Sequence, residues 1–576
     1  MSERVDSKAP NGKQRSASSG PERWGRLPLH PLLLAVYPSL AILSANWGKS
    51  DPIDAVRAVA ISLVLAAGLM LLGRLFSGDW RTAAVLASWF LLLLFTYGHV
   101  YHTVRDVLGE AVGRHLYTGP LWSVLLAAGW APMFRWRPAS ARLTGILNAT
   151  AVVAVALPLA AIATGAVTGA ASAAGHEAER RDRPLPVVGA ELDNRPDIYY
   201  VILDMYTRQD VLADELDYDN SAFLGGLRDR GFAVIDCARS NYMGTLPSLT
   251  ASLNRDYLPV VAPRLLEGAD AVTDLSPLVL DSLVRADLEA LGYTTVALET
   301  GFSPTDWTDA AGYRSRSQDL ALRLGLLGGV NPLESMLLRG SAGTVLYDLR
   351  QSLPAAWLPL LDAPYLEHRD RLLYQLGQLE TLAPLAGPKF VFVHLLAPHD
   401  PFVFGPDGEQ LIRNTPFTLN ADVEYLEWSS FARGYSDQVT YLNKRILGAV
   451  DRILAESRQP PIVILQGDHG IPRLKPAWQR LAILEALYLP GVPPASLDRA
   501  MTPVNIFRLI AREYFGEDIE LLENRSYDVL DDGSRLSFRE GEEGSPGCRE
   551  IGGGQRQAEG LLALHERLLE RNANDL

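Results

Sequence analysis

The first third of this 576-residue chain contains five long apolar stretches. They run approximately over residues 29–46, 57–73, 82–101, 116–134 and 145–171. Each comes close to the ~20 residues that an α-helix needs to cross the hydrocarbon core of a membrane. The run from Val85 to Phe95 is the clearest, whereas Pro31 and Pro38 interrupt the first stretch. The sequence therefore predicts an N-terminal bundle of about five transmembrane helices over residues 27–171.

Basic residues predict the orientation of this bundle. Residues 1–26 are rich in Ser, Gly, Pro, Lys and Arg and are predicted to form a disordered arm. The arm and the second and fourth connections carry more Lys and Arg than the alternate connections, which places the arm in the cytoplasm. An odd number of spans then places everything after residue 171 outside the cytoplasm. We expect a multi-pass protein of the cell membrane with an extracytoplasmic domain.

The remainder of the chain has the texture of an α/β domain. Residues 172–196 are predicted to be a linker, 197–536 a catalytic domain, and 537–576 a tail with a short helix at 557–571. Strand-like runs at 198–203, 293–298, 389–394 and 461–466 alternate with helical runs such as 219–230 and 435–456. This alternation predicts a mostly parallel central sheet, in which ligands bind at the carboxyl ends of the strands.

Charge and cysteine content exclude several classes of function. The formal net charge of −14 argues against a nucleic-acid-binding protein that depends on phosphate contacts. Cys237 and Cys548 are the only cysteines, too few for a disulfide framework or a thiolate zinc site. A single bridge between them and two unpaired thiols are equally compatible with the sequence.

Three predicted strands end in side chains that bind metal ions. The first runs into Asp204, a later one into His394 with His399 close behind, and the last into Gly467 and the pair Asp468-His469. Carboxylates and imidazoles on rigid strand ends are suitable ligands for a divalent ion. A lone histidine is more often a satisfied core residue, but this set predicts a metal site.

The segment from Ser240 to Asn254 is the second chemically informative element. It passes through a turn at Gly244 and continues into a helix-compatible run in which Pro247 suits the first turn. A Thr245 hydroxyl at that boundary would lie beside helix-end amides that favour anions, the environment a nucleophile needs. A simple helix cap is the competing interpretation of Thr245, and this segment alone favours it.

Together these motifs resemble the sulfatase-like branch of the alkaline phosphatase superfamily over residues 197–515. The nearest group is the membrane-anchored lipoteichoic acid synthases and phosphoethanolamine transferases. The run Gly467-Asp468-His469-Gly470 resembles the family's Asp-His-Gly metal signature, and Leu203-Asp204 resembles its strand-end acidic ligand. The stretch from His394 to Pro401 resembles the family's His…Pro-His-x-Pro element of the substrate pocket. The resemblance implies an alkaline phosphatase/sulfatase-like fold.

The nucleophile position departs from that of true sulfatases. Thr245-Leu246-Pro247-Ser248-Leu249 keeps the Pro and Ser of the family's Cys-x-Pro-Ser-Arg pattern, but it begins with Thr. Threonine cannot be converted to formylglycine, and it is the nucleophile of the phosphotransferase branch. Met205 stands where many sulfatases have a second acidic ligand, which favours a single metal ion.

The resemblance implies a metal-dependent enzyme with a threonine nucleophile. Asp204, Thr245, Asp468 and His469 are expected to bind one divalent ion, with zinc and manganese favoured, while His394 and His399 act as acid, base or oxygen-binding groups. The expected donor is a membrane lipid or a lipid-linked molecule, and the expected acceptor is a glycan or a lipid. A second ion at His394 and His399 is a minority alternative. Two other functions stay open: a phosphate- or sulfate-ester hydrolase, and a non-catalytic membrane protein with a degenerate domain.

Overall fold

The computed structural model describes residues 27–109, 112–135, 141–181, 195–263, 265, 271–316, 330–411, 416–419, 423, 426–475, 477–531, 536–540 and 548. The chain divides into two compact units, which we describe separately. A helical unit contains residues up to 41, 58–160 and 340–342, and an α/β unit contains the rest. The predicted arm over 1–26 and the predicted helix over 557–571 lie outside the described residues.

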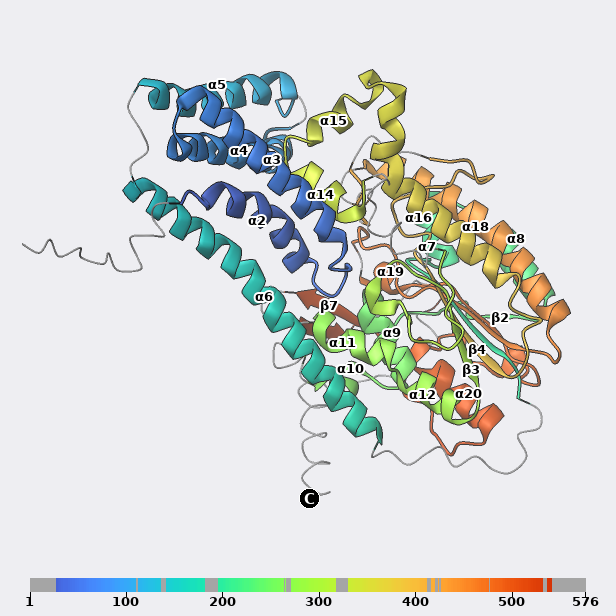
Figure 1. Ribbon diagram of the computed structural model, residues 1–576. Helices are drawn as coiled ribbons and strands as arrows, with labels where there is room; N and C mark the ends of the chain where they lie inside the picture. The colour runs from blue at the N-terminus through green and yellow to red at the C-terminus, as the bar shows by residue number, and fades with distance from the viewer. Residues whose placement is uncertain are drawn as a thin grey trace, which may run out of the picture. The chain divides into compact units, whose positions relative to one another are not determined.

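Helices occupy all five apolar stretches of the first third (Figure 1). They are α2 (His30–Ala45), α3 (Asp54–Ser77), α4 (Trp80–Leu108), α5 (His115–Arg135) and α6 (Ala141–Arg181). Within the described residues, three are long and apolar enough to cross a membrane, with spans at Asp54–Ser77, Trp80–Leu108 and Arg142–Ala171. Five membrane crossings therefore stay a prediction. Helix α6 continues to Arg181, ten residues into the predicted linker.

Polar side chains and indoles join the helices of the helical unit. The Asn148 side-chain oxygen on α6 accepts hydrogen bonds from the backbone N–H groups of Leu29 and His30, at 3.0 and 2.9 Å. These bonds satisfy two of the free donors at the start of α2. Between α4 and α5, the indole N–H of Trp122 donates to the Leu93 carbonyl at 2.9 Å. Many apolar side chains, such as Leu75 at 75% exposure, remain uncovered, as expected for helices that face lipid.

A six-stranded mixed sheet forms the centre of the α/β unit, in the order β2-β6-β5-β1-β4-β3. Four adjacent strands are mutually parallel: β5 (Ile462–Gln466), β1 (Ile198–Leu203), β4 (Lys389–Leu395) and β3 (Thr294–Ala297). Strand β6 (Glu485–Tyr488) runs antiparallel to β5 and to β2 (Ala233–Val234). All four predicted strands are present, but a mostly parallel sheet is confirmed only for this group of four, and sequence analysis missed β2 and β6.

Helices cover both faces of the sheet, because alternate residues of each strand point to opposite sides. Tyr199, Val201 and Leu203 of β1 pack in one core with the helices that include α7, α8, α16 and α18. Ile198, Tyr200 and Ile202 pack in the other core with α9, α11, α12 and α20 (Figure 1). The helices of this unit are α7 (Gln209–Leu216), α8 (Ser221–Asp229), α9 (Thr245–Asn254), α10 (Leu258–Val261), α11 (Ala271–Leu280), α12 (Leu283–Ala290), α14 (Pro332–Gly340), α15 (Thr344–Asp348), α16 (Leu358–Leu379), α18 (Trp428–Glu456), α19 (Ala477–Leu481) and α20 (Ile506–Phe515). Short 3₁₀ turns are η2 (Ser303–Thr305), η3 (Arg350–Ser352), η4 (Ala355–Trp357), η5 (Pro494–Ser496) and η6 (Pro503–Asn505).

The end of the described chain returns to the segment that precedes α9. Strands β7 (Tyr527–Asp531) and β8 (Leu536–Glu540) form an antiparallel hairpin. Tyr527 makes a bridge with Tyr242. Cys237 and Cys548 form a disulfide with a Cα–Cα distance of 5.7 Å, so the bridged alternative holds.

Candidate metal and catalytic site

The turn after β1 places Asp204 at the carboxyl end of the sheet. The Asp204 backbone N–H donates to the Leu395 carbonyl at the end of β4, at 3.0 Å. Met205 follows with a φ of 64°, a left-handed conformation that non-glycine residues rarely adopt. The Tyr435 hydroxyl on α18 donates to the Met205 carbonyl at 2.7 Å and accepts from the Thr207 N–H at 3.0 Å. Tyr435 therefore holds the turn that directs the Asp204 carboxylate.

The turn after β5 requires glycine at both ends of the Asp-His pair. A Cβ on Gly467 would lie 2.3 Å from the Tyr206 carbonyl oxygen, and one on Gly470 would lie 2.7 Å from that of Gln479. Asp468 between them is fully buried, and its Oδ1 accepts from the Met205 and His469 N–H groups at 3.0 and 2.9 Å. The backbone thus fixes one carboxylate oxygen and leaves Oδ2 to face the site.

Asp204, Asp468 and His469 form one buried group whose candidate ligand atoms all lie within 4.8 Å of one another. Asp204 Oδ1 and Asp468 Oδ2 are buried without a hydrogen-bond partner. The His394 Nε2 atom is also buried without one. A buried polar atom without a partner costs about 1–3 kcal/mol, and the cost is greater when the group is charged. Several such atoms that face one another indicate a binding site for a cation.

The Nδ1 atoms of the histidine rings are held by hydrogen bonds, so that in the neutral forms of His469 and His399 the Nε2 atom carries the lone pair. The Nδ1–H of His469 donates to the Gly470 carbonyl at 2.8 Å, and that of His399 donates to the Asp400 carbonyl at 2.7 Å. His394 Nδ1 lies 2.9 Å from Thr305 Oγ1, whose own proton can bond the Phe302 carbonyl at 3.2 Å. A metal ligand needs this tautomer, with one ring nitrogen bonded to the protein and the other available.

The distances between ligand atoms fit a small divalent ion. Bond lengths of roughly 2.0–2.2 Å in a tetrahedral zinc site place neighbouring ligand atoms about 3.3–3.6 Å apart. His469 Nε2 lies 3.4 Å from Asp204 Oδ1, and His394 Nε2 lies 3.5 Å from Asp204 Oδ2. His469 Nε2 and Asp468 Oδ2 are slightly farther apart, at 3.8 Å. The two Asp204 oxygens therefore face different imidazoles.

The ionisable groups of the site perturb one another strongly. Burial disfavours the Asp204 anion, but the positive charge of His399 and hydrogen bonds from His394 and His469 hold its pKa well below its usual range. Burial and the Asp204 charge raise the pKa of Asp468. Burial opposes protonation of His469, yet the neighbouring carboxylates raise its pKa to about 9. Without a cation, the two carboxylates are thus compensated mainly by protons on the histidines.

Thr245 is the first residue of α9 and is half-buried. It follows Gly244, whose φ is 91°. Within the described residues, no hydrogen bond joins Thr245 to Asp204, Asp468 or His469. The predicted role of Thr245 as ligand and nucleophile therefore remains a prediction, and so does the predicted role of His399 in the reaction.

Sequence reasoning missed the residues that support the site. Thr305 orients the ring of His394, and the Gln375 side-chain N–H donates to the His394 carbonyl at 2.9 Å. Tyr435 supports the turn after β1 from α18. These three belong to segments whose own patterns indicate only a turn or a core-facing helix, so the sequence contains no signal for their role.

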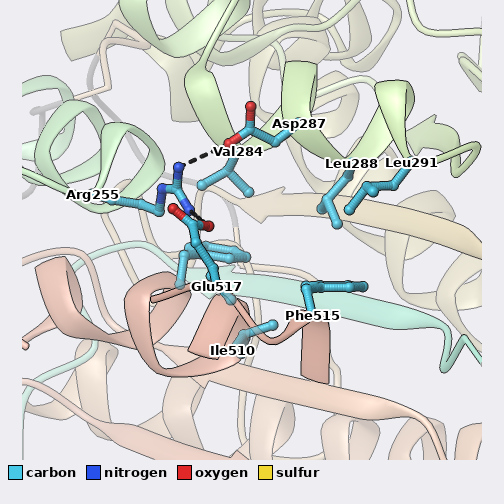
Figure 2. A pocket seen from close by; sticks show the side chains of 10 residues that line it. Arg255, Val284, Asp287, Leu288, Leu291, Ile510, Phe515 and Glu517 are labelled. Atoms are coloured by element: carbon cyan, nitrogen blue, oxygen red, sulfur yellow. Dashed lines mark hydrogen bonds and ion pairs between the residues drawn. The ribbon is translucent and has the colours of Figure 1, made fainter. Parts of the chain in front are cut away.

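A separate pocket lies beside Arg255, the residue that follows α9 (Figure 2). Arg255 pairs with Asp287 at 2.8 Å and with Glu517 at 2.6 Å, and the lining is otherwise apolar, with Phe515 among its residues. None of the predicted site residues lines this pocket. It is distinct from the metal-binding group.

Comparisons with known proteins give structural similarities alone. No protein-family model and no curated protein matches the chain. The structure is similar to the C-terminal periplasmic domain of EcEptC from Escherichia coli in complex with Zn, at 13% identity and a TM-score of 0.36, covering 62% of this chain and 96% of that domain. It is also similar to a phosphonate monoester hydrolase of Agrobacterium radiobacter, at 13% identity and a TM-score of 0.37, covering 58% of this chain and 80% of that one.

A third similar structure is that of an integral membrane protein. It is the integral membrane protein lipooligosaccharide phosphoethanolamine transferase A (EptA) from Neisseria meningitidis, at 13% identity and a TM-score of 0.32, covering 85% of this chain and 94% of that one. Because these TM-scores are low, we infer the function from the residues of the site.

Proposed function

We propose that this chain is a membrane-anchored, metal-dependent enzyme of the sulfatase-like type that transfers a phospho-group through Thr245. The observation that carries the proposal is the buried group formed by Asp204, Asp468 and His469, whose candidate ligand atoms all lie within 4.8 Å of one another, with Asp204 Oδ1 and Asp468 Oδ2 lacking hydrogen-bond partners. These three side chains, together with Thr245, would hold one divalent ion, with zinc or manganese favoured. Such an ion supplies Lewis-acid stabilisation of phosphoryl oxygens and lowers the pKa of a coordinated hydroxyl.

The reaction would proceed in two displacements. In the first, Thr245 Oγ1 forms a bond to phosphorus, and the bond between phosphorus and the donor's leaving oxygen breaks. The threonine proton passes to a base of the site, and the leaving oxygen receives a proton from His394 or His399. In the second, an acceptor hydroxyl bonds to phosphorus and releases Thr245, and the proton transfers reverse. Water in place of that hydroxyl would give hydrolysis.

The membrane helices and the disulfide support an extracytoplasmic site near lipid. Three described helices are long and apolar enough to cross a membrane. The bridge between Cys237 and Cys548 is typical of proteins in an oxidising compartment. We therefore propose a multi-pass protein of the cell membrane that takes a lipid or lipid-linked donor and transfers its head group to a glycan or lipid acceptor.

The arrangement of His394 also supports the alternative of two metal ions. Its Nε2 atom faces Asp204 Oδ2, whereas His469 faces Oδ1. His394 together with Asp204 would hold a second ion beside the one that Asp204, Asp468 and His469 would hold. Metal analysis of the purified chain would separate one bound ion from two.

A direct test uses the full chain in detergent with vesicles of phosphatidylethanolamine and phosphatidylglycerol. Mass spectrometry should detect a head-group phosphate adduct on Thr245, and chelation should abolish its formation until Zn²⁺ or Mn²⁺ is returned. Thr245→Ala should lack the adduct and lose turnover, with an unchanged melting temperature. Undiminished turnover in Thr245→Ala, or activity indifferent to chelation, would refute the mechanism. Release of free phosphorylated head group without a modified acceptor would identify a hydrolase.

A further inference from the structure

The loop that leads into Thr245 is anchored by parts of the chain that lie far away in sequence. Residues 235–244 connect β2 to α9 without forming a helix or a strand of the sheet. The Ser240 N–H donates to the Leu481 carbonyl at 2.8 Å, and Arg239 makes a bridge with Ala482. The side-chain side of Gly244 faces open space, because a Cβ placed on this residue would have nothing within 4 Å. The position of Thr245 therefore depends on contacts upstream and downstream of Gly244.

Asn241 makes the densest set of these contacts. It is fully buried, and its side-chain oxygen accepts from the Val504 N–H at 2.8 Å. Its side-chain N–H donates to the Arg525 carbonyl at 2.9 Å, and its own carbonyl accepts from the Tyr527 N–H at 2.8 Å. One residue, four positions before Thr245, thus joins the loop to η6 and to the start of β7. Only an amide of this length can donate and accept in this geometry.

Tyr242 extends the anchorage to α9. Its hydroxyl accepts from the Leu258 N–H at 2.9 Å, and its ring stacks on Tyr527 with 5.4 Å between centroids. Its carbonyl accepts from the Ser248 hydroxyl at 2.6 Å. Ser248 lies in the first turn of α9, so the loop and the helix are fixed on both sides of Gly244.

We propose that Asn241 is a positioning residue for Thr245, and that the segment from Arg525 to Tyr527 serves the active site through it. This inference rests on the proposed function of Thr245. Asp204 and Asp468 stand on rigid strand ends, whereas Thr245 stands on a loop and a helix that belong to another part of the unit. The alignment of the threonine hydroxyl with the ligand set therefore depends on the anchor at Asn241.

The test substitutes Asn241→Asp, which keeps the size and the acceptor but removes the donor to Arg525. We expect kcat for vesicle lipid to fall about 10- to 100-fold, the cost of a misplacement of about 1 Å, with KM within 2-fold and metal content unchanged. Single-turnover formation of the Thr245 adduct should slow by the same factor. Hydrogen exchange over residues 240–246 should accelerate, while exchange over 462–470 stays as in the wild type.

Asn505→Asp is the matched control. Asn505 is equally buried, and its side chain bonds the Leu522 backbone and the Asn524 side chain of the same C-terminal segment; none of these bonds involves residues 235–244. If Asn241 only stabilises the fold, then Asn241→Asp and Asn505→Asp should lose equal activity when their melting temperatures are lowered equally. That result, or a wild-type kcat in folded Asn241→Asp, would overturn the proposal.

Two further outcomes keep the inference separate from the proposed function. If Asn241→Asp does not fold, Asn241→Ser replaces it in the test, because serine retains an acceptor and a weak donor. Its kcat and its rate of adduct formation should fall by the same factor. If the wild type forms no adduct and Thr245→Ala keeps its activity, the proposed function has failed. A normal wild-type adduct with unaffected Asn241 variants refutes only the positioning role.

Discussion

Asp468→Asn should separate the stability of the metal-free protein from its ability to bind metal. The change is isosteric, and the amide oxygen can still accept from the Met205 and His469 N–H groups. It removes a fully buried carboxylate whose pKa is raised by burial and by the charge of Asp204. The metal-free variant should therefore melt at the same temperature as the metal-free wild type or higher, because a repulsive buried charge is gone.

Metal should stabilise the wild type much more than the Asp468→Asn variant. At a metal concentration of 100 times its Kd, the wild type gains about 2.7 kcal/mol of folding free energy. Replacing a residue that only hydrogen-bonds to a metal ligand lowers the metal affinity about 10- to 100-fold. Asp468 is expected to be a ligand itself, so its replacement should lower the metal affinity about 100-fold or more. At the same metal concentration the variant would then gain about 0.4 kcal/mol. For a unit of this size the difference corresponds to a melting shift of roughly 3 °C.

Calorimetry or scanning fluorimetry of the full chain in detergent would measure these shifts. The protein is first treated with chelator and then titrated with Zn²⁺ or Mn²⁺. Asn443→Asp, in the core on the other side of the sheet from α9, provides a control for a polar change that leaves the ligand set intact. Metal-induced stabilisation of Asp468→Asn equal to that of the wild type would refute the assignment of Asp468 as a ligand.

Three further substitutions test other parts of the structure. Burial raises the pKa of Asp306 to about 6, so the folded state binds this proton more tightly than the unfolded state, and stability is lost as pH rises from about 4 to 6. Asp306→Asn should therefore be more stable than the wild type at pH 7.5, by at most about 3 kcal/mol, with the difference vanishing near pH 4 in denaturant titrations. Thr305→Val should lower kcat about 10- to 100-fold without unfolding the protein, because the ring of His394 loses its Nδ1 partner; a wild-type kcat would contradict this. Gly470→Ala should destabilise by about 1–3 kcal/mol or more in thermal melts, since its Cβ would overlap three carbonyl oxygens, and an unchanged melting temperature would contradict the tight turn.

The sequence alone predicts the ends of the four parallel strands well. Strands β1, β4 and β5 are short, mostly apolar runs that are buried on both faces, and in β1 and β5 the run stops at a charged or polar turn that contains Asp204 or Asp468. Such runs are recognisable because both faces of the strand pack against helices. Strand β6 was missed because it has four residues and begins with Glu485, a fully buried acid that breaks the apolar pattern. Strand β2 has only two residues, too few for any period.

The geometry of the candidate site could be predicted only in part. Strand ends that are neighbours in a sheet converge, so Asp204 and the Asp468-His469 pair were expected to meet, and the structure brings them together. The support from Tyr435 could not be predicted, because that tyrosine lies 230 residues beyond the turn it holds. The position of Thr245 relative to these ligands depends in the same way on Asn241 and the distant β7 segment.

The hydrogen bonds around the histidines point to a cation more strongly than the ligand types do. A neutral imidazole can donate to the Asp204 carboxylate only if its Nε2 atom carries the proton. In the neutral ring of His469, the Nδ1 proton is used on the Gly470 carbonyl, which leaves the Nε2 lone pair facing Asp204 Oδ1. Two lone pairs opposite each other repel unless a proton or a metal ion lies between them. On His469 a proton can fill that place only below the raised pKa of about 9, whereas a divalent ion satisfies both sides at once.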